Sequence, residues 1–358
     1  MHVLNAIASD FYNFEQAVTE LRAYKPLYVK MKLIYGCNLK CEMCNHWRDG
    51  REAPLPIGRF KEILTELAGL GCKKVHFSGG ECMLLPQISD LVSHAASLGI
   101  RPVMTSNGTL IDKIKAKQLI EAGLRGINIS IDSPDRKTHD RIRGVSGAWK
   151  SACRAVETIR RYAHKGKITI RINTVVGRSN YHTLASMPDF AHALGADALN
   201  LIAIDDHCGE ILSMRKSDLL RYNAQIGPQI AGQALALGLF RDVAEANIFG
   251  AGDADLKAAR RGQYALRWYD QHACYIPWMH SLIDFNGLVY ICCMTREKIP
   301  PLGDLKKTTF TEIWNGPAYA AIRSLMHPPK LASCRSCDDF LLENSRLAQL
   351  RSEKASSS

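Results

Sequence analysis

The feature that most constrains the fold is an alternation of short apolar runs with segments of helical periodicity. Six runs have the length and composition of β-strands, and they cover residues 27–34, 73–77, 101–105, 126–131, 167–176 and 198–204. Apolar residues at helical spacing fill the intervals, over residues 56–70, 86–98, 112–122, 148–163 and 181–194. Strands that alternate with helices in this way form βα units around a parallel sheet. Such sheets bind ligands beyond the C-terminal ends of their strands, so we expect the functional residues directly after each predicted strand.

Three cysteines follow the first predicted strand. Cys37, Cys41 and Cys44 have the spacing C-x3-C-x2-C. Cysteine thiolates normally hold an iron–sulfur cluster in sets of four, so a set of three would leave one iron open to a ligand from outside the protein. Two alternatives stay open on spacing alone. One is a zinc loop completed by His46, and the other is three cysteines that share no ligand.

The cysteine loop resembles the cluster-binding loop of the radical S-adenosylmethionine (SAM) enzymes, both in spacing and in its place after the first strand. The resemblance implies that Cys37, Cys41 and Cys44 bind a [4Fe–4S] cluster, and that its fourth iron chelates the amino and carboxylate groups of SAM. An electron from the cluster would cleave SAM to methionine and a 5'-deoxyadenosyl radical. The six βα units would form the partial (β/α)6 barrel of that family.

Polar segments at the ends of the later strands resemble the SAM-binding motifs of the same family. Gly79-Gly80-Glu81 follows the second strand and is similar to the Gly-Gly-Glu motif, which holds the SAM amino group. Its glycines would let the backbone approach a ligand closely. The other SAM contacts that the resemblance implies are Asn107, Ser130, Asp132, Asn173 and Arg143. For Arg143, an arginine on a helix surface is the alternative.

The sixth predicted strand ends in Asp205-Asp206-His207-Cys208. These side chains should face the mouth of the barrel, where a substrate would lie. A thiol can donate a hydrogen atom to a carbon radical, so Cys208 is the candidate hydrogen donor. A thiol without a catalytic role is the alternative.

A second set of cysteines lies near the C-terminal end of the sequence. Its candidate metal ligands are Cys274, Cys292, Cys334 and Cys337. A hairpin is predicted over residues 283–291 with Asn286-Gly287 at its turn, and a helix over residues 310–326. Four thiolates from three places can close on one cluster, although zinc could also use them. The Gly-x4-Cys spacing favours Cys292 over its neighbour Cys293.

This second set resembles the SPASM or twitch extension of radical SAM enzymes. The Gly-x4-Cys spacing, the Glu-Ile-Trp-Asn-Gly segment at residues 312–316 and the closing Cys-x2-Cys pair carry the resemblance. Full SPASM domains continue with further cysteines, whereas only a polar segment follows Cys337 here. The resemblance therefore implies one auxiliary iron–sulfur cluster, of the [4Fe–4S] type.

The expected fold class is α/β, with a partial (β/α)6 TIM-like barrel followed by a small auxiliary cluster domain made of a β-hairpin and a helix. We divide the chain into an N-terminal helical extension (1–26), the barrel (27–212), a helical connection (213–270), the auxiliary domain (271–342) and a polar tail (343–358).

Composition excludes several classes. The formal charge of +11 suits an anionic substrate, but no basic block is interleaved with aromatic residues, so nucleic acid is not the expected partner. No apolar run reaches membrane-spanning length, and the first residues lack the pattern of a signal peptide. Twelve cysteines without a secretion signal indicate reduced thiols and metal binding, and hence a cytoplasmic protein.

The resemblance implies oxidation of a sugar- or aminocyclitol-type small molecule, with the auxiliary cluster as electron acceptor and a flavodoxin or ferredoxin as external electron donor. The alternatives are a redox-neutral sugar epimerase or decarboxylase that uses Cys208, a maturase that modifies a ribosomally made peptide, and a non-catalytic metal-binding protein. The Gly-Gly-Glu segment argues against the last, because a structural metal site needs no SAM pocket.

Overall fold

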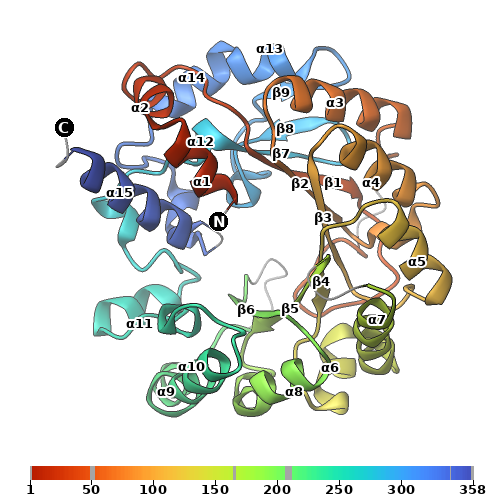
Figure 1. Ribbon diagram of the computed structural model, residues 1–358. Coiled ribbons are helices and arrows are strands. Elements are labelled where there is room, and N and C mark those ends of the chain that lie inside the picture. Colours follow the sequence, from red (N-terminus) through yellow and green to blue (C-terminus); the bar gives the residue numbers. More distant parts are fainter. Residues whose placement is uncertain (1, 49–52, 164–166, 206–211, 339, 356–358) are drawn as a thin grey trace.

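The computed structural model describes residues 2–48, 53–163, 167–205, 212–338 and 340–355 (Figure 1). A curved sheet of nine strands organises it, in the order β6-β5-β4-β3-β2-β1-β7-β8-β9. Six parallel neighbours form the barrel part, β1 (Tyr28–Ile34), β2 (Lys74–Gly79), β3 (Arg101–Ser106), β4 (Gly126–Ser130), β5 (Thr169–Val176) and β6 (Ala198–Ala203). The predicted α/β fold with six parallel strands is confirmed.

Helices surround the outer side of this sheet (Figure 1). They are α3 (Ile57–Gly69), α4 (Ile88–Ser97), α5 (Lys113–Glu121), α7 (Ala148–Tyr162) and α8 (Met187–Ala193), the last preceded by a 3₁₀ turn (Tyr181–Ser186). One further helix, α6 (Arg136–Arg143), follows β4 and was not predicted. Its composition is almost entirely polar, so no apolar periodicity marks it in the sequence.

The alternation of side chains along each strand separates a packed face from a polar face. In β1, Val29, Met31 and Leu33 are fully buried in the core that the outer helices complete. Lys30 and Lys32 lie on the opposite, concave face and are half-buried. The inside of the barrel is therefore lined with polar side chains that are available to a ligand.

The auxiliary domain continues the barrel sheet. Strand β7 (His280–Ile283) pairs in parallel with β1, and β8 (Leu288–Tyr290) and β9 (Gly303–Asp304) follow in antiparallel order. The predicted hairpin is present, and Gly287 at its turn has the positive φ of +91° that glycine adopts without strain. Because β7 hydrogen-bonds to β1, the second cysteine set is held rigidly beside the strand that leads into the first.

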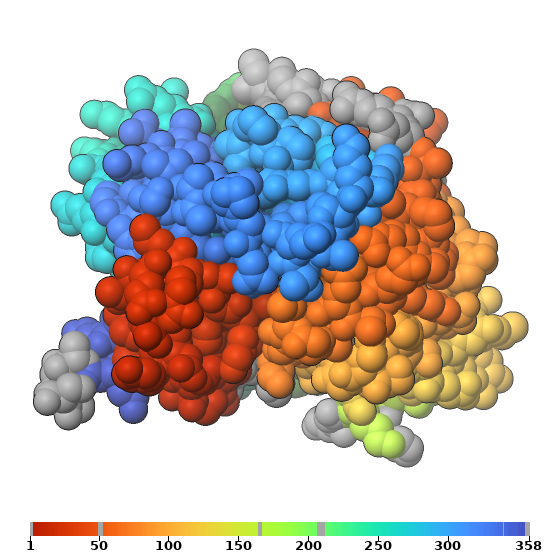
Figure 2. Space-filling view, turned by 90° about the horizontal axis from the view of Figure 1, so that it is seen from above, coloured from red at the N-terminus to blue at the C-terminus, as the bar shows by residue number. Residues whose placement is uncertain are grey.

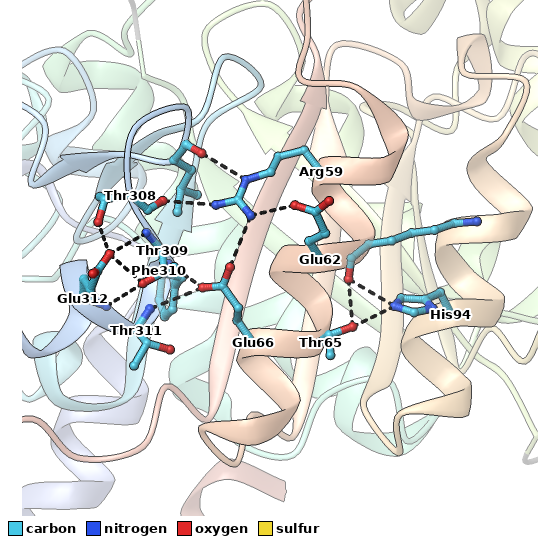
Figure 3. Close-up of polar contacts among 12 residues, drawn as sticks. Arg59, Glu62, Thr65, Glu66, His94, Thr308, Thr309, Phe310, Thr311 and Glu312 are labelled. Carbon is cyan, nitrogen blue, oxygen red and sulfur yellow. Dashed lines mark hydrogen bonds and ion pairs between the residues drawn. The ribbon is translucent and has the colours of Figure 1, made fainter.

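A polar clamp joins the auxiliary domain to the outside of the barrel (Figure 3). The side chain of Arg59 on α3 donates to the carbonyl oxygens of Leu305 and Thr308 at 3.0 and 3.1 Å. Glu66, two turns further along α3, accepts from the backbone N–H of Phe310 at 2.6 Å. Phe310 begins α13 (Phe310–Asn315), so the carboxylate lies at a helix N-terminus, where unpaired N–H groups favour negative charge. The next helix is α14 (Pro317–Ser324).

The two ends of the chain pack together on the auxiliary domain (Figures 1 and 2). The N-terminal extension forms α1 (His2–Ser9) and α2 (Phe11–Thr19). The segment predicted to be a polar tail instead forms α15 (Leu341–Ala355), and this prediction is wrong. Leu347 is fully buried, and Arg351 donates to Glu15 at 2.7 Å.

The connection over residues 213–270 covers the far edge of the barrel at β6. It contains α9 (Lys216–Arg221), a π-helical turn (Tyr222–Ile226), α10 (Gly227–Ala236) and α11 (Asp253–Ala259). Tyr264 donates its hydroxyl hydrogen to the carbonyl oxygen of Ile204 at 2.6 Å. The backbone N–H of Ala265 bonds to the carbonyl oxygen of Arg335 at 3.0 Å, so this segment links β6 to the closing cysteine pair. The short helix α12 (Ile276–Met279) then leads into β7.

Candidate functional site

The first cysteine loop is held in place by backbone hydrogen bonds to the end of α6. Lys40 N–H bonds to the carbonyl oxygen of Arg143 at 3.1 Å, and Glu42 N–H to that of Ile142 at 2.9 Å. Gly144 ends α6 with a φ of +68°, and a Cβ there would lie 2.4 Å from the Lys40 carbonyl oxygen. Only glycine therefore allows the helix end and the loop to approach this closely.

The three cysteines of this loop share one small apolar cluster. Cys41 is buried with Leu39, and Cys37 and Cys44 pack against them half-exposed. Burial raises the pKa of the Cys41 thiol to about 11 and also raises that of Cys37. Such thiols ionise when a metal supplies the compensating charge. The donor set therefore suits a cluster that is partly shielded from water and open on one side.

A buried ion pair lies next to this loop. The guanidinium of Arg143 donates through Nη2 to Asp132 Oδ1 at 2.9 Å, and its Nε forms an ion pair with Oδ2 at 2.6 Å. Its Nη1 lies 3.7 Å from the Cys41 sulfur. The negative charges of Asp132 and Cys41 hold the pKa of Arg143 above its ordinary value, despite its burial. Arg143 is 8% exposed, so the surface-arginine alternative is wrong. It places a fixed positive charge beside a cluster ligand.

The carboxylate of Glu81 is used inside the protein. Its Oε1 accepts from Met83 N–H at 3.1 Å and from the Ser106 hydroxyl at 2.8 Å, and its Oε2 accepts from Asn107 N–H at 2.7 Å. Glu81 is 0% exposed, and burial raises its pKa. A direct bond from this carboxylate to the SAM ammonium, as the prediction had it, does not fit this geometry. Glu81 instead fixes the turn that carries Asn107.

The two glycines before Glu81 allow two backbone segments to pack together. A Cβ at Gly80 would lie 2.0 Å from the Gly36 carbonyl oxygen, and one at Gly79, whose φ is +136°, would lie 2.3 Å from that of Ile34. Gly80 N–H bonds to the Ile34 carbonyl oxygen at 2.8 Å. The glycines thus fix the end of β2 against the residues just before Cys37.

The remaining predicted SAM contacts lie at the same end of the barrel. The Asn107 side-chain amide donates to Asn38 Oδ1 at 2.9 Å and lies 3.8 Å from the Cys37 sulfur. Ser130 and Asn173 are paired neighbours on β4 and β5, both half-buried on the concave face. Cys208, the predicted hydrogen donor, lies outside the described residues.

Sequence reasoning missed a contact on the third cysteine. Nδ1 of His46 lies 3.2 Å from the Cys44 sulfur, and its Nε2 lies 3.3 Å from Lys32 Nζ on the concave face of β1. A lysine ammonium only donates, so Nε2 accepts and Nδ1–H points at the sulfur. Tyr35 stacks on the imidazole with ring centroids 4.4 Å apart. The sequence signal was a histidine two residues after a ligand cysteine, which we had considered only as a zinc ligand.

A hydrogen-bonded row crosses the concave face and was also missed. The Tyr28 hydroxyl lies 2.9 Å from His76 Nδ1, and His76 Nε2 lies 2.8 Å from the Thr105 hydroxyl. Burial, reinforced by the positive charges of Lys30 and Arg171 among others, depresses the pKa of His76 well below its ordinary value. The sequence alone could not identify this row, because it depends on which face of each strand turns inward.

The second cysteine set surrounds a small apolar cavity of about 20 Å³. Cys274, Cys292, Cys334 and Cys337 all line it, together with apolar side chains and Tyr269. Cys293 does not line it. Burial raises the pKa of Cys274 to about 11 and of Cys334 to about 12.

Both cysteine sets offer the thiolate donors of an iron–sulfur cluster. Within the described part of the chain, no three His, Cys, Asp or Glu side chains are arranged to hold one metal ion. Zinc requires four donors at about 2.0–2.3 Å from one centre. Thiolates around a cluster bind separate irons and stand further apart. All four cysteines of the second set line one apolar cavity, as thiolates that share one cluster would.

Comparisons with known proteins agree with this geometry. Residues 31–190 match the family model of the radical SAM superfamily, and residues 274–338 match that of the SPASM iron–sulfur cluster-binding domain. The chain is therefore a radical SAM protein. It belongs to the members of that superfamily that carry a SPASM domain, and its cofactors are a [4Fe–4S] cluster with SAM and an auxiliary iron–sulfur cluster.

Several curated proteins are similar to this chain. An AdoMet-dependent heme synthase of Methanosarcina barkeri is 29% identical over 181 residues, which are 49% of this chain and 50% of that protein. A PqqA peptide cyclase of Gluconobacter oxydans is 28% identical over 325 residues, 87% of this chain and 83% of that protein. The chain spans about half the length of the first curated relatives that it matches.

Solved structures share the fold. Streptococcus suis SuiB bound to S-adenosylmethionine superposes with a TM-score of 0.66 at 20% identity, over 95% of this chain and 77% of that one. The AdoMet-bound structure of anSMEcpe gives a TM-score of 0.63 at 19% identity, over 88% of this chain and 84% of that one.

Among the described helices, none has the length and hydropathy to cross a bilayer.

Proposed function

We propose that this chain is an enzyme that cleaves SAM reductively and modifies a substrate held on the concave face of the barrel. The bound cluster and SAM supply a 5'-deoxyadenosyl radical, which abstracts a hydrogen atom from an unactivated C–H group. Cys37, Cys41 and Cys44 hold the cluster, and Arg143 holds a positive charge beside it. The observation that carries the proposal is that two chains of contacts connect the barrel to this loop. One runs from Glu81 through Asn107 to Cys37, and the other runs from Asp132 through Arg143 to Cys41.

The roles of the polar residues follow from their positions. Ser130 at the C-terminal end of β4 and its neighbour Asn173, within β5, lie on the concave face, where they can bond to SAM. The side-chain amide of Asn107 bonds to Asn38 and lies beside the Cys37 sulfur, where its second N–H can bond to SAM. Glu81 and Asp132 act by positioning, because their carboxylates are fully buried and engaged.

We further propose that the reaction is a net oxidation. Four cysteines line the second cavity, so a cluster bound there has every ligand position filled by the protein and no open iron for substrate. Such a cluster is suited to accepting the electron of a substrate radical. Lys32 contacts His46 of the first loop and lies on β1, the strand that pairs with β7 of the auxiliary domain. We place the protein in the cytoplasm, because its ligand thiols must stay reduced.

The substrate we propose is a hydroxylated small molecule of the sugar type. Hydroxyl and amide groups on the concave face, such as Thr105, Asn128 and Asn200, suit the hydroxyl groups of such a compound. The relatives named above are not sugar oxidases, so this substrate is our own assignment. Within the predicted class, a neutral or anionic sugar is favoured over an aminocyclitol, because Lys30 and Arg171 would repel an ammonium group.

Peptide modification is the second candidate. It is favoured by the similarity to the PqqA peptide cyclase over 87% of this chain, and by the solved structure of SuiB bound to its precursor peptide SuiA. Comparing a panel of sugars with synthetic peptides separates the two candidates. Only the true substrate should raise the yield of 5'-deoxyadenosine, and deuterium from its labelled C–H group should appear in that 5'-deoxyadenosine.

The test of the enzyme proposal is 5'-deoxyadenosine formation from SAM under dithionite, after anaerobic reconstitution. We expect the wild type to form it and the Cys37/Cys41/Cys44→Ala variant to form none. A Cys72→Ala variant is the control, because Cys72 is buried behind β1 and away from both sites. Failure of the reconstituted wild type to cleave SAM would refute the proposed reaction.

A further inference from the structure

A surface pocket beside α11 concentrates positive charge. It has a volume of about 260 Å³ and is lined by the basic side chains of Lys257, Arg261, Arg267 and Arg335. All four of these side chains are exposed. One acidic residue, Asp270, also lines the pocket and pairs with Arg267 at 3.3 Å, so four basic groups face a single carboxylate. We call these five residues the basic pocket.

The basic pocket shares a wall with the auxiliary cluster cavity. Tyr269 lines both, and its hydroxyl lies 3.9 Å from the Cys337 sulfur. Arg335 lies between the ligand cysteines Cys334 and Cys337 in the sequence. A molecule bound in the basic pocket is therefore separated from the cluster site by one side chain.

The shape of the pocket argues for a protein partner. A small anion is held by buried donors that exclude water, whereas all four basic side chains here are exposed. Exposed charges of one sign around an open depression attract an oppositely charged surface and steer its approach. Leu266 and Arg267 adopt positive φ angles of +47° and +62°, a costly conformation for residues other than glycine that is often found at functional sites. The segments that carry the pocket adjoin at one side of the molecule (Figure 2, teal and blue).

We propose that the basic pocket docks an acidic one-electron carrier protein, of the flavodoxin or ferredoxin type, which reoxidises the auxiliary cluster. The proposal rests on the net oxidation proposed above. In that reaction the substrate radical gives one electron to the auxiliary cluster, and its hydroxyl proton passes to water as the C=O bond forms. The cluster then gives this electron to the docked carrier, whose flavin or iron–sulfur centre is reduced by one electron. The cluster is thereby returned to its oxidised state for the next turnover.

The experiment isolates the auxiliary cluster as the electron source. The Cys37/Cys41/Cys44→Ala variant, reconstituted and reduced, is mixed with oxidised flavodoxin, and formation of the flavin semiquinone is followed by stopped flow. In this background we compare Arg261→Glu/Arg335→Glu with Arg154→Glu/Arg161→Glu. The second pair changes the net charge equally but lies exposed on α7, on the outside of the barrel.

We expect the pocket variant to lose at least about tenfold in second-order rate, and the control to stay within about twofold. The rate of the parent should fall with added salt, and that of the pocket variant should depend on salt much less. Equal rates for the two variants would overturn the proposal. The rate at which a neutral quinone oxidises the auxiliary cluster should be the same in the pocket variant and the parent. If the pocket variant loses as much rate with quinone as with flavodoxin, the proposal is also overturned. An iron content near zero in this background would contradict the proposed oxidation instead, because no auxiliary cluster would be present.

Discussion

At the scale of single residues, Arg143 shows how the barrel and the cysteine loop are connected. One guanidinium bonds to Asp132 at the end of β4 and reaches the sulfur of Cys41. The pair is buried, so removing one partner would leave an uncompensated charge, a strongly destabilising change. The cluster loop is thus positioned by charges that belong to the barrel, and not by the cysteines alone.

His46 is expected to set the reduction potential of the first cluster. A hydrogen bond from Nδ1–H to the Cys44 sulfur stabilises the reduced cluster, whose sulfurs carry more negative charge. His46→Phe removes this bond and should lower the potential by roughly 40 mV, which is about 1 kcal/mol for one electron. The measurement is a redox titration followed by EPR. His46→Gln keeps an N–H donor and should lower the potential less; equal potentials in all three proteins would show that His46 has no such effect.

Buried His139 predicts a loss of stability in acid. Its Nδ1 accepts from Asp132 N–H at 3.1 Å, and burial lowers its pKa from 6.5 to about 4. The unfolded chain therefore binds a proton between these values that the folded chain does not. The contribution of His139 to the free energy of unfolding is fully present above pH 6.5, and it falls by up to about 3 kcal/mol as the pH is lowered toward 4. Urea unfolding of the apoprotein at several pH values should give a smaller decrease for His139→Gln, whose side-chain oxygen can still accept; an unchanged decrease would exclude His139 as a cause.

At the scale of elements, the sequence predicted what local periodicity controls. The six barrel strands appear close to their predicted bounds, because each βα unit carries its own apolar pattern. The parallel pairing of β7 with β1 could not be predicted, since nothing within residues 280–283 indicates its partner. Helix α15 was mistaken for a tail because part of its buried face is polar, with Asn344 fully buried and bonded to Tyr275 N–H at 2.7 Å.

The clamp between α3 and α13 makes a prediction at this scale. Glu66→Ala removes the carboxylate that accepts from Phe310 N–H, and should lower the free energy of unfolding by about 1 kcal/mol. Glu62→Ala is the matched control on the same helix, because Glu62 pairs with Arg59 at the surface with 65% of its side chain exposed. Its loss should cost only about 0.5 kcal/mol or less. Equal losses in urea unfolding would mean that Glu66 contributes no more than a surface ion pair.

At the scale of the whole molecule, two cysteine sets are brought to one continuous sheet. Their spacing was readable in the sequence, because a cluster needs several thiols on short loops. The contacts that orient them were not, since Lys32, Asp132 and Arg143 come from segments that meet only in the folded barrel. The role of Glu81 changed for the same reason: its three donors come from two loops that the sequence does not place together.

The most direct test of two independent clusters is iron and sulfide per chain, with Mössbauer spectra, after anaerobic reconstitution. We expect about eight irons in the wild type and about four in the Cys37/Cys41/Cys44→Ala variant. A variant with Cys274, Cys292, Cys334 and Cys337 changed to Ala should also hold about four, now in the SAM-binding cluster, whereas Cys293→Ala should keep about eight. About four irons in the wild type and none in the first variant, with zinc in the preparation, would make the second site structural and would contradict the proposed electron transfer.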